Sequence, residues 1–295
     1  MPQTTVELSD GRVLQVWVEG PDEGDLVIWH HGTPGSGLPY RPSVEDARRR
    51  GLRLASYSRP GYGASARHEG RSVADCAADA AAIADRVGAE RFFTGGGSGG
   101  GPHALACAAR LPDRVLGAVS VSGIVPWGAG DIDFLQGMGE ANHEEFGAAV
   151  DGPDALRVWM DEHWKEWADA GTPEEIVASM RDLVSDVDRA CVTGEFAEYL
   201  VEDSGVSLAN GYWGWFDDDL AFTRDWGFDS ADIHVPVAIW QGRQDRFVPF
   251  AHGEWLAKHV PDARPHLYEE HGHLSLGLAA FGAILDDLLD NRRER

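Results

Sequence analysis

The chain has 295 residues, a hydrophobic fraction of 43% and a formal net charge of −24. That length is enough for one large domain with a buried core, with or without an insertion. The acidic balance argues against nucleic acid as a partner, because phosphate binding needs a basic surface. No run of about 18 apolar residues predicts a membrane span, and residues 1–7 lack the basic segment and apolar core of a signal peptide. We therefore expect a cytoplasmic protein that acts on a small molecule and has neither a membrane nor a nucleic acid as a partner.

The three cysteines, Cys76, Cys107 and Cys191, lie far apart in the sequence. Their odd number and wide spacing predict reduced, mostly buried thiols rather than a disulfide framework. No pair has the spacing of a zinc site. We expect no metal and no cofactor.

Predicted strands and helices alternate along the first part of the chain. Residues 4–19 have the alternating apolar pattern of a hairpin around a turn at Ser9–Arg12. Further strands are predicted at 26–29, 52–58, 92–93 and 115–122, and helices at 43–50, 73–87 and 104–111. The pattern resumes late in the chain with a strand at 235–241, a helix at 250–259, a strand near 266–268, a helix at 276–289 and a charged tail at 291–295 that is expected to fray. This alternation predicts an α/β fold, a mostly parallel sheet with helices on both faces, formed by residues 1–125 and 231–295.

The stretch between these two parts has a different character. Residues 126–230 contain 25 acidic and 5 basic residues, a net charge of −20, and seven of the eleven tryptophans. They show many helical patterns and no convincing strand. We predict a helical lid inserted at 126–230, and we expect much of its charge to be solvated, as at Asp217–Asp219 and Asp161-Glu162.

A single serine stands among glycines between a predicted strand and a predicted helix. Gly96–Gly100 fits G-x-S-x-G, a sharp strand-to-helix turn that strains the backbone and leaves no room for side chains near the serine. At the N-terminus of the following helix, Ser98 would meet free backbone amides that favour a developing negative charge. Ser98 is therefore predicted to be a nucleophile.

Two other interpretations of this glycine-rich stretch are disfavoured by its flanks. A flexible linker does not fit the Phe92-Phe93 pair before it and the alanine-rich run after it. A dinucleotide-binding G-x-G-x-x-G turn needs an acidic residue about 20 positions later, at the end of the next strand. That strand ends in Ser120–Gly123, which contains no carboxylate.

A serine nucleophile needs a base, and the base needs an orienting acid. Asp245 follows the strand predicted at 235–241, at the carboxyl edge where parallel sheets bind ligands. His273 stands between the last predicted strand and the last predicted helix. Taken alone, Asp245 fits a loop carboxylate and His273 a surface histidine, but the order serine, acid, histidine predicts that Ser98, Asp245 and His273 act together. His271 is the rival base.

An oxyanion hole needs two backbone amides near the nucleophile. Gly99, directly after Ser98, is expected to supply one amide, and Thr33, in the loop after the strand at 26–29, the other. Because Thr33 would act through its backbone, its side chain is expected to matter little. His30 and His31 are then expected to be structural.

These segments together resemble the α/β-hydrolase superfamily. His31–Gly35 resembles its H-G-x-P oxyanion loop, Arg59–Ser65 its R-x-G-x-G-x-S segment, Gly96–Gly100 its nucleophile elbow, Gln241–Pro249 its acid loop and Gly272-His273 its histidine loop. The resemblance covers residues 1–125 and 231–295. It implies the α/β-hydrolase fold and a Ser-His-Asp triad.

Within the superfamily, the H-G-x-P loop and the helical lid are similar to esterases and to the proline iminopeptidase-like group. Those iminopeptidases typically have a tryptophan where this chain has Gly99 and a glycine where it has Thr33. Dehalogenases and epoxide hydrolases of this fold use an aspartate nucleophile, which Ser98 does not match. The resemblance implies a cofactor-independent, carboxylesterase-like serine hydrolase that cleaves a small ester or amide through an acyl-enzyme. An aminopeptidase, a cofactor-free lyase or oxygenase, and a non-catalytic ligand receptor on the same fold are the alternatives.

The lid is expected to set the substrate, because insertions on a fixed scaffold determine specificity. Trp127, Trp213 and Trp215 are predicted to line an apolar substrate pocket, and most of the other lid tryptophans to pack in the lid's own core. The lid would stand over the mouth of the site, so its negative charge predicts that neutral or cationic apolar substrates are accepted and anionic ones disfavoured. Charge that serves solubility alone is the alternative.

Overall fold

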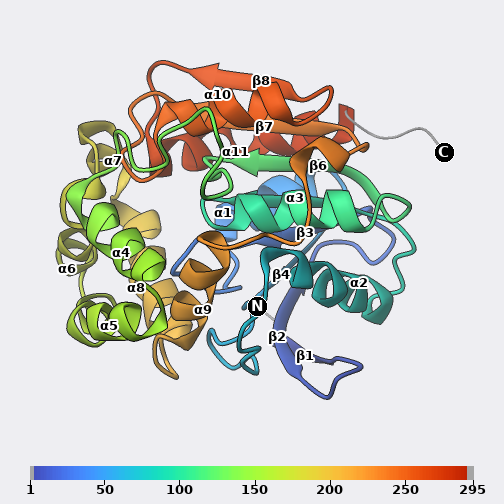
Figure 1. Ribbon diagram of the computed structural model, residues 1–295. Helices are drawn as coiled ribbons and strands as arrows, with labels where there is room; N and C mark the ends of the chain where they lie inside the picture. Colours follow the sequence, from blue (N-terminus) through green and yellow to red (C-terminus); the bar gives the residue numbers. More distant parts are fainter. Residues whose placement is uncertain (1–2, 291–295) are drawn as a thin grey trace.

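The structure is a computed structural model that describes residues 3–290, so the charged tail at 291–295 lies outside it. Eight strands form one sheet: β1 (Gln3–Glu7), β2 (Val13–Glu19), β3 (Leu26–His30), β4 (Arg53–Tyr57), β5 (Phe92–Gly97), β6 (Val115–Val121), β7 (Val237–Gly242) and β8 (Arg264–Tyr268). Their order is β1-β2-β4-β3-β5-β6-β7-β8 (Figure 1). β2 pairs antiparallel with both β1 and β4, and all the other pairs are parallel.

Five helices alternate with these strands: α1 (Arg41–Arg49), α2 (Cys76–Arg86), α3 (Gly100–Arg110), α10 (Phe250–His259) and α11 (His273–Asp290). Each predicted element outside 126–230 is present, with its ends moved by a few residues. The predicted α/β fold class is therefore confirmed.

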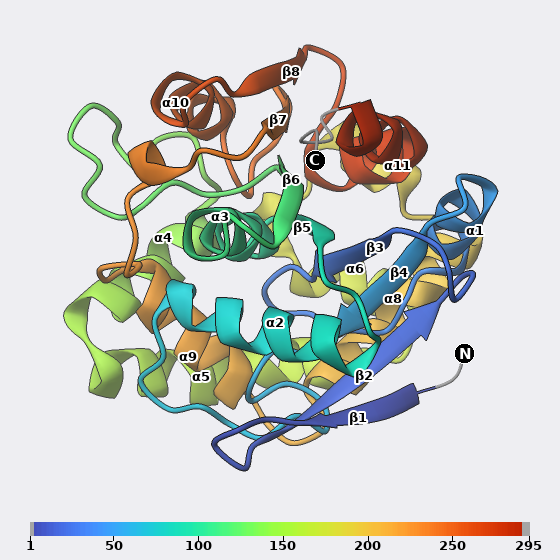
Figure 2. The same cartoon turned by 90° about the vertical axis from the view of Figure 1, so that its right-hand side faces the viewer.

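The sheet is covered on both faces because its central strands are apolar on both sides. Every residue of β6 and β7 is buried, as expected for parallel strands between two helical layers. α2, α3 and α10 pack on one face, where Ile83, Leu105 and Leu256 join one core cluster. α1 and α11 pack on the other face, where Val44 and Ile284 join a second one. Figure 2 shows α3 and α11 on opposite sides of the strands.

Residues 126–230, which we call the lid segment, contain helices and no strand. The α-helices are α4 (Glu140–Asp151), α5 (Pro153–Ala168), α6 (Pro173–Ser179), α7 (Asp186–Cys191), α8 (Gly194–Ser207) and α9 (Trp213–Phe222). They gather beside the end of the sheet at which the parallel strands have their carboxyl ends (Figure 1). Across residues 3–290, no helix combines the length and the apolar character needed to cross a membrane.

Candidate active site

Ser98 stands on the turn between β5 and α3. Its φ angle is 54°, in the left-handed region that residues other than glycine rarely adopt. The turn is fixed by two hydrogen bonds, from the Ser98 amide to the Val121 carbonyl (2.8 Å) and from the Gly101 amide to the Ser98 carbonyl (2.9 Å). A Cβ atom on Gly96 would collide with the backbone of Gly100. The strained turn that G-x-S-x-G predicts is therefore present at Ser98.

Asp245 and His273 form a hydrogen-bonded pair. Nδ1 of His273 lies 2.8 Å from Oδ2 of Asp245, whose side chain is completely buried. Asp245 is held in turn by the backbone amides of Phe247 (2.9 Å) and Val248 (2.8 Å) and by the side-chain amide of Gln241 (3.1 Å). With Nδ1 donating to this fixed carboxylate, Nε2 is the ring atom left to accept a proton.

The environment of His273 favours its charged form. Burial alone would lower the pKa of the ring, but the charge and hydrogen bond of Asp245 and the charge of Asp188 outweigh burial, so the pKa lies above its ordinary value. The ring also stacks on Phe247, with 4.5 Å between the centroids. The rival base, His271, packs its ring edge-on against Tyr268 instead. The structure thus pairs His273, and not His271, with Asp245.

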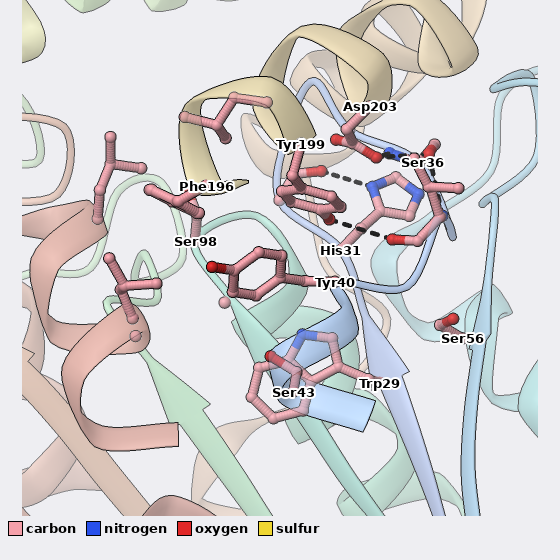
Figure 3. A pocket seen from close by; sticks show the side chains of 18 of the residues that line it. Trp29, His31, Ser36, Tyr40, Ser43, Ser56, Ser98, Phe196, Tyr199 and Asp203 are labelled. Carbon is pink, nitrogen blue, oxygen red and sulfur yellow. Dashed lines mark hydrogen bonds between the residues drawn. The ribbon is translucent and has the colours of Figure 1, made fainter. Parts of the chain in front are cut away.

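Ser98 and His273 line the same cavity, which has a volume of about 340 Å³. The apolar side chains in its wall include Trp29, Leu38, Tyr40, Trp167, Ile176, Met180, Phe196, Tyr199, Leu200, Leu274, Leu278 and Phe281. Figure 3 looks into this cavity and shows the rings of Tyr40, Phe196 and Tyr199 gathered near Ser98. The centroid of the Tyr40 ring lies 5.5 Å from that of Phe196 and 5.0 Å from that of Tyr199.

Thr33 and Gly99, the predicted oxyanion donors, lie against each other, since a Cβ atom on Gly99 would collide with the Thr33 side chain. The Thr33 hydroxyl donates to Oδ2 of Asp218 (2.8 Å) and accepts from Nη2 of Arg59 (2.8 Å). The expectation that this side chain matters little for turnover stays a prediction, and the two hydrogen bonds argue against it, because they fasten the oxyanion loop to the lid segment. His31 is structural as expected, and its Nε2 accepts the Arg59 amide at 3.0 Å.

Arg59, from the R-x-G-x-G-x-S segment, is completely buried behind the oxyanion loop. Its guanidinium donates to the backbone carbonyls of His31-Gly32 and, at 2.7 Å, to Asp218 of α9. Asp218 also accepts from Tyr62 (2.9 Å) and Arg71 (2.7 Å). Burial would raise the pKa of Asp218, but the charges of Arg59 and Arg71 hold it well below its usual range. This buried ion-pair network joins the oxyanion loop to the lid segment.

The prediction that Asp217–Asp219 is solvated is wrong. These three residues are only 3%, 0% and 1% exposed. Asp217 is paired with Arg67 through two contacts of 2.8 Å, and Asp218 belongs to the network of Arg59. The triplet is buried because α9 packs against the basic loop that follows β4. The Asp161-Glu162 pair is exposed, as expected.

Asp219 differs from its two neighbours because, among the described residues, it shares a hydrogen bond only with another acid, Glu145, and receives none from a basic group or an amide. Burial, together with the charges of Glu145 and Asp218, raises its pKa well above the usual range. Burial also raises the pKa of Glu145 to about 7, although Nε1 of Trp215 donates to that carboxylate at 2.7 Å. Two facing acids of this kind hold fewer than two negative charges near neutral pH.

A second, smaller cavity of about 50 Å³ brings these acids to the nucleophile. Ser98, Gly99, Glu145, Asp219 and Trp215 all line it. Both cavities include Ser98 in their walls. Ser98 therefore lies between the larger cavity and a smaller, mostly apolar one whose wall contains two acids.

Of the three tryptophans predicted to line the pocket, Trp215 lines the smaller cavity at Ser98. Trp127 lines a separate groove that Trp255 also lines, and Trp213 lies under the guanidinium of Arg67 at 4.2 Å. The predictions for Trp127 and Trp213 are therefore corrected. Trp167, which was expected to pack in the lid core, lines both cavities at Ser98.

Two further lid acids touch the site, and no motif in the sequence marks either of them. Asp203 of α8 accepts from the Ser36 hydroxyl (2.5 Å) and amide (3.2 Å), at the end of the oxyanion loop. Asp188 of α7 accepts from the backbone amide of His273 at 2.9 Å. Their only sequence signal is their place in an unusually acidic lid, which does not single them out.

Comparison with known proteins agrees with this geometry. The family model described as the alpha/beta hydrolase fold matches residues 25–280. A non-heme chloroperoxidase of Streptomyces lividans is 32% identical over 250 residues, which cover 84% of each chain. A proline iminopeptidase of Neisseria gonorrhoeae is 27% identical and matches 84% of this chain and 83% of its own. Epoxide hydrolase B of Mycobacterium tuberculosis is 29% identical over 159 residues, which cover 52% of this chain but less than half, 44%, of that protein.

Solved structures show the same fold at lower sequence identity. A bromoperoxidase from Bacillus anthracis superposes with a TM-score of 0.72 at 20% identity, covering 98% of this chain and 100% of its own. An esterase from a Rhodococcus species superposes with a TM-score of 0.69 at 19% identity, covering 99% and 100%. The family match over most of the chain, the strained serine turn and the parallel sheet together show that this chain belongs to the α/β-hydrolase family.

Proposed function

We propose that this protein is a serine hydrolase that cleaves a small ester or amide bond through an acyl-enzyme on Ser98. The observation that supports it most directly is the 2.8 Å hydrogen bond from Nδ1 of His273 to the buried Asp245. His273 shares a cavity with Ser98, and Ser98 has the strained backbone of a nucleophile elbow.

In this proposal His273 is the general base. Its Nε2 takes the proton of the Ser98 hydroxyl while Oγ forms a bond to the substrate carbonyl carbon. The backbone amides of Thr33 and Gly99 stabilise the resulting oxyanion. The protonated ring then gives its proton to the leaving group as the acyl-enzyme forms. Water activated by the same ring hydrolyses the acyl-enzyme and frees Ser98.

The wall of the larger cavity indicates which chemical groups of a substrate would fit beside Ser98. The 340 Å³ cavity, lined by rings such as Tyr40, Phe196 and Tyr199, favours an apolar group next to the carbonyl. Binding is favoured when an apolar substrate group is buried against this wall, because its apolar surface is then removed from water.

A second candidate, an aminopeptidase, is favoured by one observation. Asp219 and Glu145 form a buried pair of acids in the cavity that Ser98 also lines, and apart from Glu145 no group of the described residues donates to the Asp219 carboxylate. Such a pair can hold both negative charges only when a positively charged group lies beside it. A substrate ammonium group would supply that positive charge and further hydrogen-bond donors for Asp219. The similarity to a proline iminopeptidase fits this candidate.

Labelling with a fluorophosphonate, followed by peptide mapping, tests the proposal. The expected result is one adduct on Ser98 in the folded protein, and no adduct in Ser98→Ala or in the unfolded wild type. Wild-type protein mixed with an activated ester should also release a burst of one equivalent of leaving group, which a receptor or an enzyme without an acyl intermediate would not do. Labelling of another residue, or the absence of both adduct and burst, would refute the acyl-enzyme.

A further inference from the structure

Asp188 is a completely buried carboxylate in the short lid helix α7. It lies 85 residues from His273 in the sequence, yet it contacts the first turn of α11, the helix that His273 begins. It has no part in the triad, and it touches neither Ser98 nor the oxyanion loop through any hydrogen bond of the described residues.

Three consecutive backbone amides of α11 donate to this one carboxylate. Oδ2 accepts from His273, and Oδ1 accepts from Leu274 and Ser275, each at 2.9 Å. The amides of a helix's first turn have no partner within the helix and are usually satisfied by a residue directly before it. Here the cap comes from the lid segment, so the position of His273 depends on a distant part of the chain.

The Asp188 carboxylate packs directly against the backbone of Gly272, the residue before His273. A Cβ atom on Gly272 would collide with Oδ2 of Asp188 and would lie 2.6 Å from its Oδ1. The remaining contact of the carboxylate is the Ser185 hydroxyl, which donates to Oδ2 at 2.8 Å. The carboxylate thus has four donors and little freedom to move.

The charge of Asp188 acts on the same ring as the charge of Asp245. The positive end of the α11 helix dipole lies at His273 and by itself opposes protonation of the imidazole. Asp188 places a full negative charge at that helix end, and Asp245 provides the second carboxylate that acts on the ring. If His273 becomes positively charged in the transition state, the carboxylates of Asp188 and Asp245 both stabilise that charge.

We propose that Asp188 is a positioning residue for His273: from the lid segment, it fixes the N-terminus of α11 and favours the protonated ring during proton transfer. The inference rests on the proposed role of His273 as general base. If the proposal holds, full activity requires that α7 be packed against the N-terminus of α11.

The test compares Asp188→Asn with Asp186→Asn, an exposed acid of the same helix that carries the same charge change. Asn keeps the size of Asp, and its one oxygen can still accept from the Leu274 and Ser275 amides, although the hydrogen bonds to Oδ2 are lost with the charge. With those two bonds kept, α11 is expected to stay in place. Loss of the charge should move the acidic limb of kcat/KM on a neutral ester down by about half a pH unit or more. It should also lower kcat by roughly tenfold with little change in KM, because the weaker base transfers the proton less well. Asp186→Asn should match wild type in all three quantities.

A second readout does not depend on turnover. The pKa of the His273 ring, followed by NMR and assigned with His273→Gln, should fall in Asp188→Asn and stay unchanged in Asp186→Asn. If Ser98→Ala remains active while this shift is seen, the proposed function fails and the inference stands. Equal His273 pKa values in Asp188→Asn and wild type overturn the inference whatever the activity. If Asp188→Asn does not fold, Asp188→Ser replaces it, and loss of folding in both variants would show that Asp188 is only a structural anchor and overturn the positioning role.

Discussion

The side chain of Thr33 fills the space that a side chain on Gly99 would need. A Cβ atom on Gly99 would collide with the Thr33 hydroxyl and lie 2.9 Å from the Thr33 Cβ. Asp218 and Arg59 hold that hydroxyl in place at 2.8 Å each. The proline iminopeptidases that this chain resembles typically have a tryptophan after the nucleophile and a glycine in the oxyanion loop. Here the large and the small residue have exchanged places, so the two departures from that pattern compensate for each other.

Gly99→Ala is expected to lower both stability and activity, because its methyl group must push the Thr33 loop away. Such overpacking typically costs about 1–3 kcal/mol of unfolding free energy, and a displaced oxyanion donor costs about 10²-fold or more in kcat. Adding Thr33→Gly to Gly99→Ala should restore part of both losses, because it removes the colliding atoms. Phe222, whose Cζ would lie 3.0 Å from the new methyl group, limits the recovery.

Thermal unfolding and ester hydrolysis of wild type, the two single variants and the double variant form a complete cycle. The interaction between the two substitutions should be favourable in both measurements. Simple addition of the two single effects would show that the contact between Thr33 and Gly99 does not explain this pair of residues.

The two histidines of the last loop should respond very differently to replacement by alanine. His273→Ala should lose several orders of magnitude in turnover, about as much as Ser98→Ala, with the fold intact. His271→Ala should cost far less, because His271 packs against Tyr268 and not against Asp245. Turnover of a neutral ester, with circular dichroism as the control for folding, measures the ranking. A larger loss in His271→Ala would move the base to that residue.

The pH profile of the wild-type enzyme should show an acidic limb above the ordinary histidine value of 6.5. His273 must be neutral to accept the Ser98 proton, and its pKa is raised, so activity is present above that pKa and lost as the pH falls through it. The limb of kcat/KM on a neutral ester reports the free enzyme. A limb well below 6.5 would contradict the electrostatic picture of Asp245 and Asp188.

Local chemistry explains why much of this structure was predictable from the sequence. Gly96–Gly100 lies between a strand and a helix, and only a sharp turn fits there, so the position of Ser98 followed. Asp245 and His273 follow strands, and parallel strands bring their carboxyl ends to one edge. Those placements depend on residues within a few positions of each site.

The lid could not be predicted in the same way, because its chemistry depends on long-range partners. Asp217–Asp219 looks like a solvated triplet until α9 is placed against Arg59, Arg67 and Arg71. Asp188 becomes a helix cap only when α7 meets α11. The composition showed correctly that the lid is acidic, but it placed Asp217–Asp219 on the surface, whereas they are buried.

Asp218→Asn is expected to destabilise the protein by about 3–5 kcal/mol, because it leaves the buried Arg59 guanidinium without its partner charge. Among the described residues, Arg71 keeps only Asp217 as an ion-pair partner, at 3.8 Å. Arg59 is completely buried and Arg71 nearly so. Glu162→Gln makes the same change of charge at an exposed position of the lid and should stay within about 0.5 kcal/mol of wild type. Denaturant unfolding measures both. Similar values for the two variants would mean that the network of Asp218 does not fasten the lid segment.

The acids of the smaller cavity should make the enzyme selective for substrates with a free amine. Ethyl 2-aminohexanoate and ethyl hexanoate differ only in that amine, so the ratio of their kcat/KM values cancels the titration of His273, which both substrates need. The ratio should rise as the pH passes about 7, where Glu145 ionises, and fall again as the amine loses its proton near pH 8. Asp219→Asn and Glu145→Gln should lower the ratio by about tenfold or more, because a charge-assisted hydrogen bond is lost. Glu144→Gln, at the neighbouring exposed acid that pairs with Arg181, should leave the ratio unchanged.

The ester of a dicarboxylic acid should be the poorest substrate of the series, because its negative charge is repelled by the same acids. If the ratio in Asp219→Asn equals that of the wild type at every pH, the Asp219 carboxylate does not contact substrate, and the acidity of the lid does not select for amines.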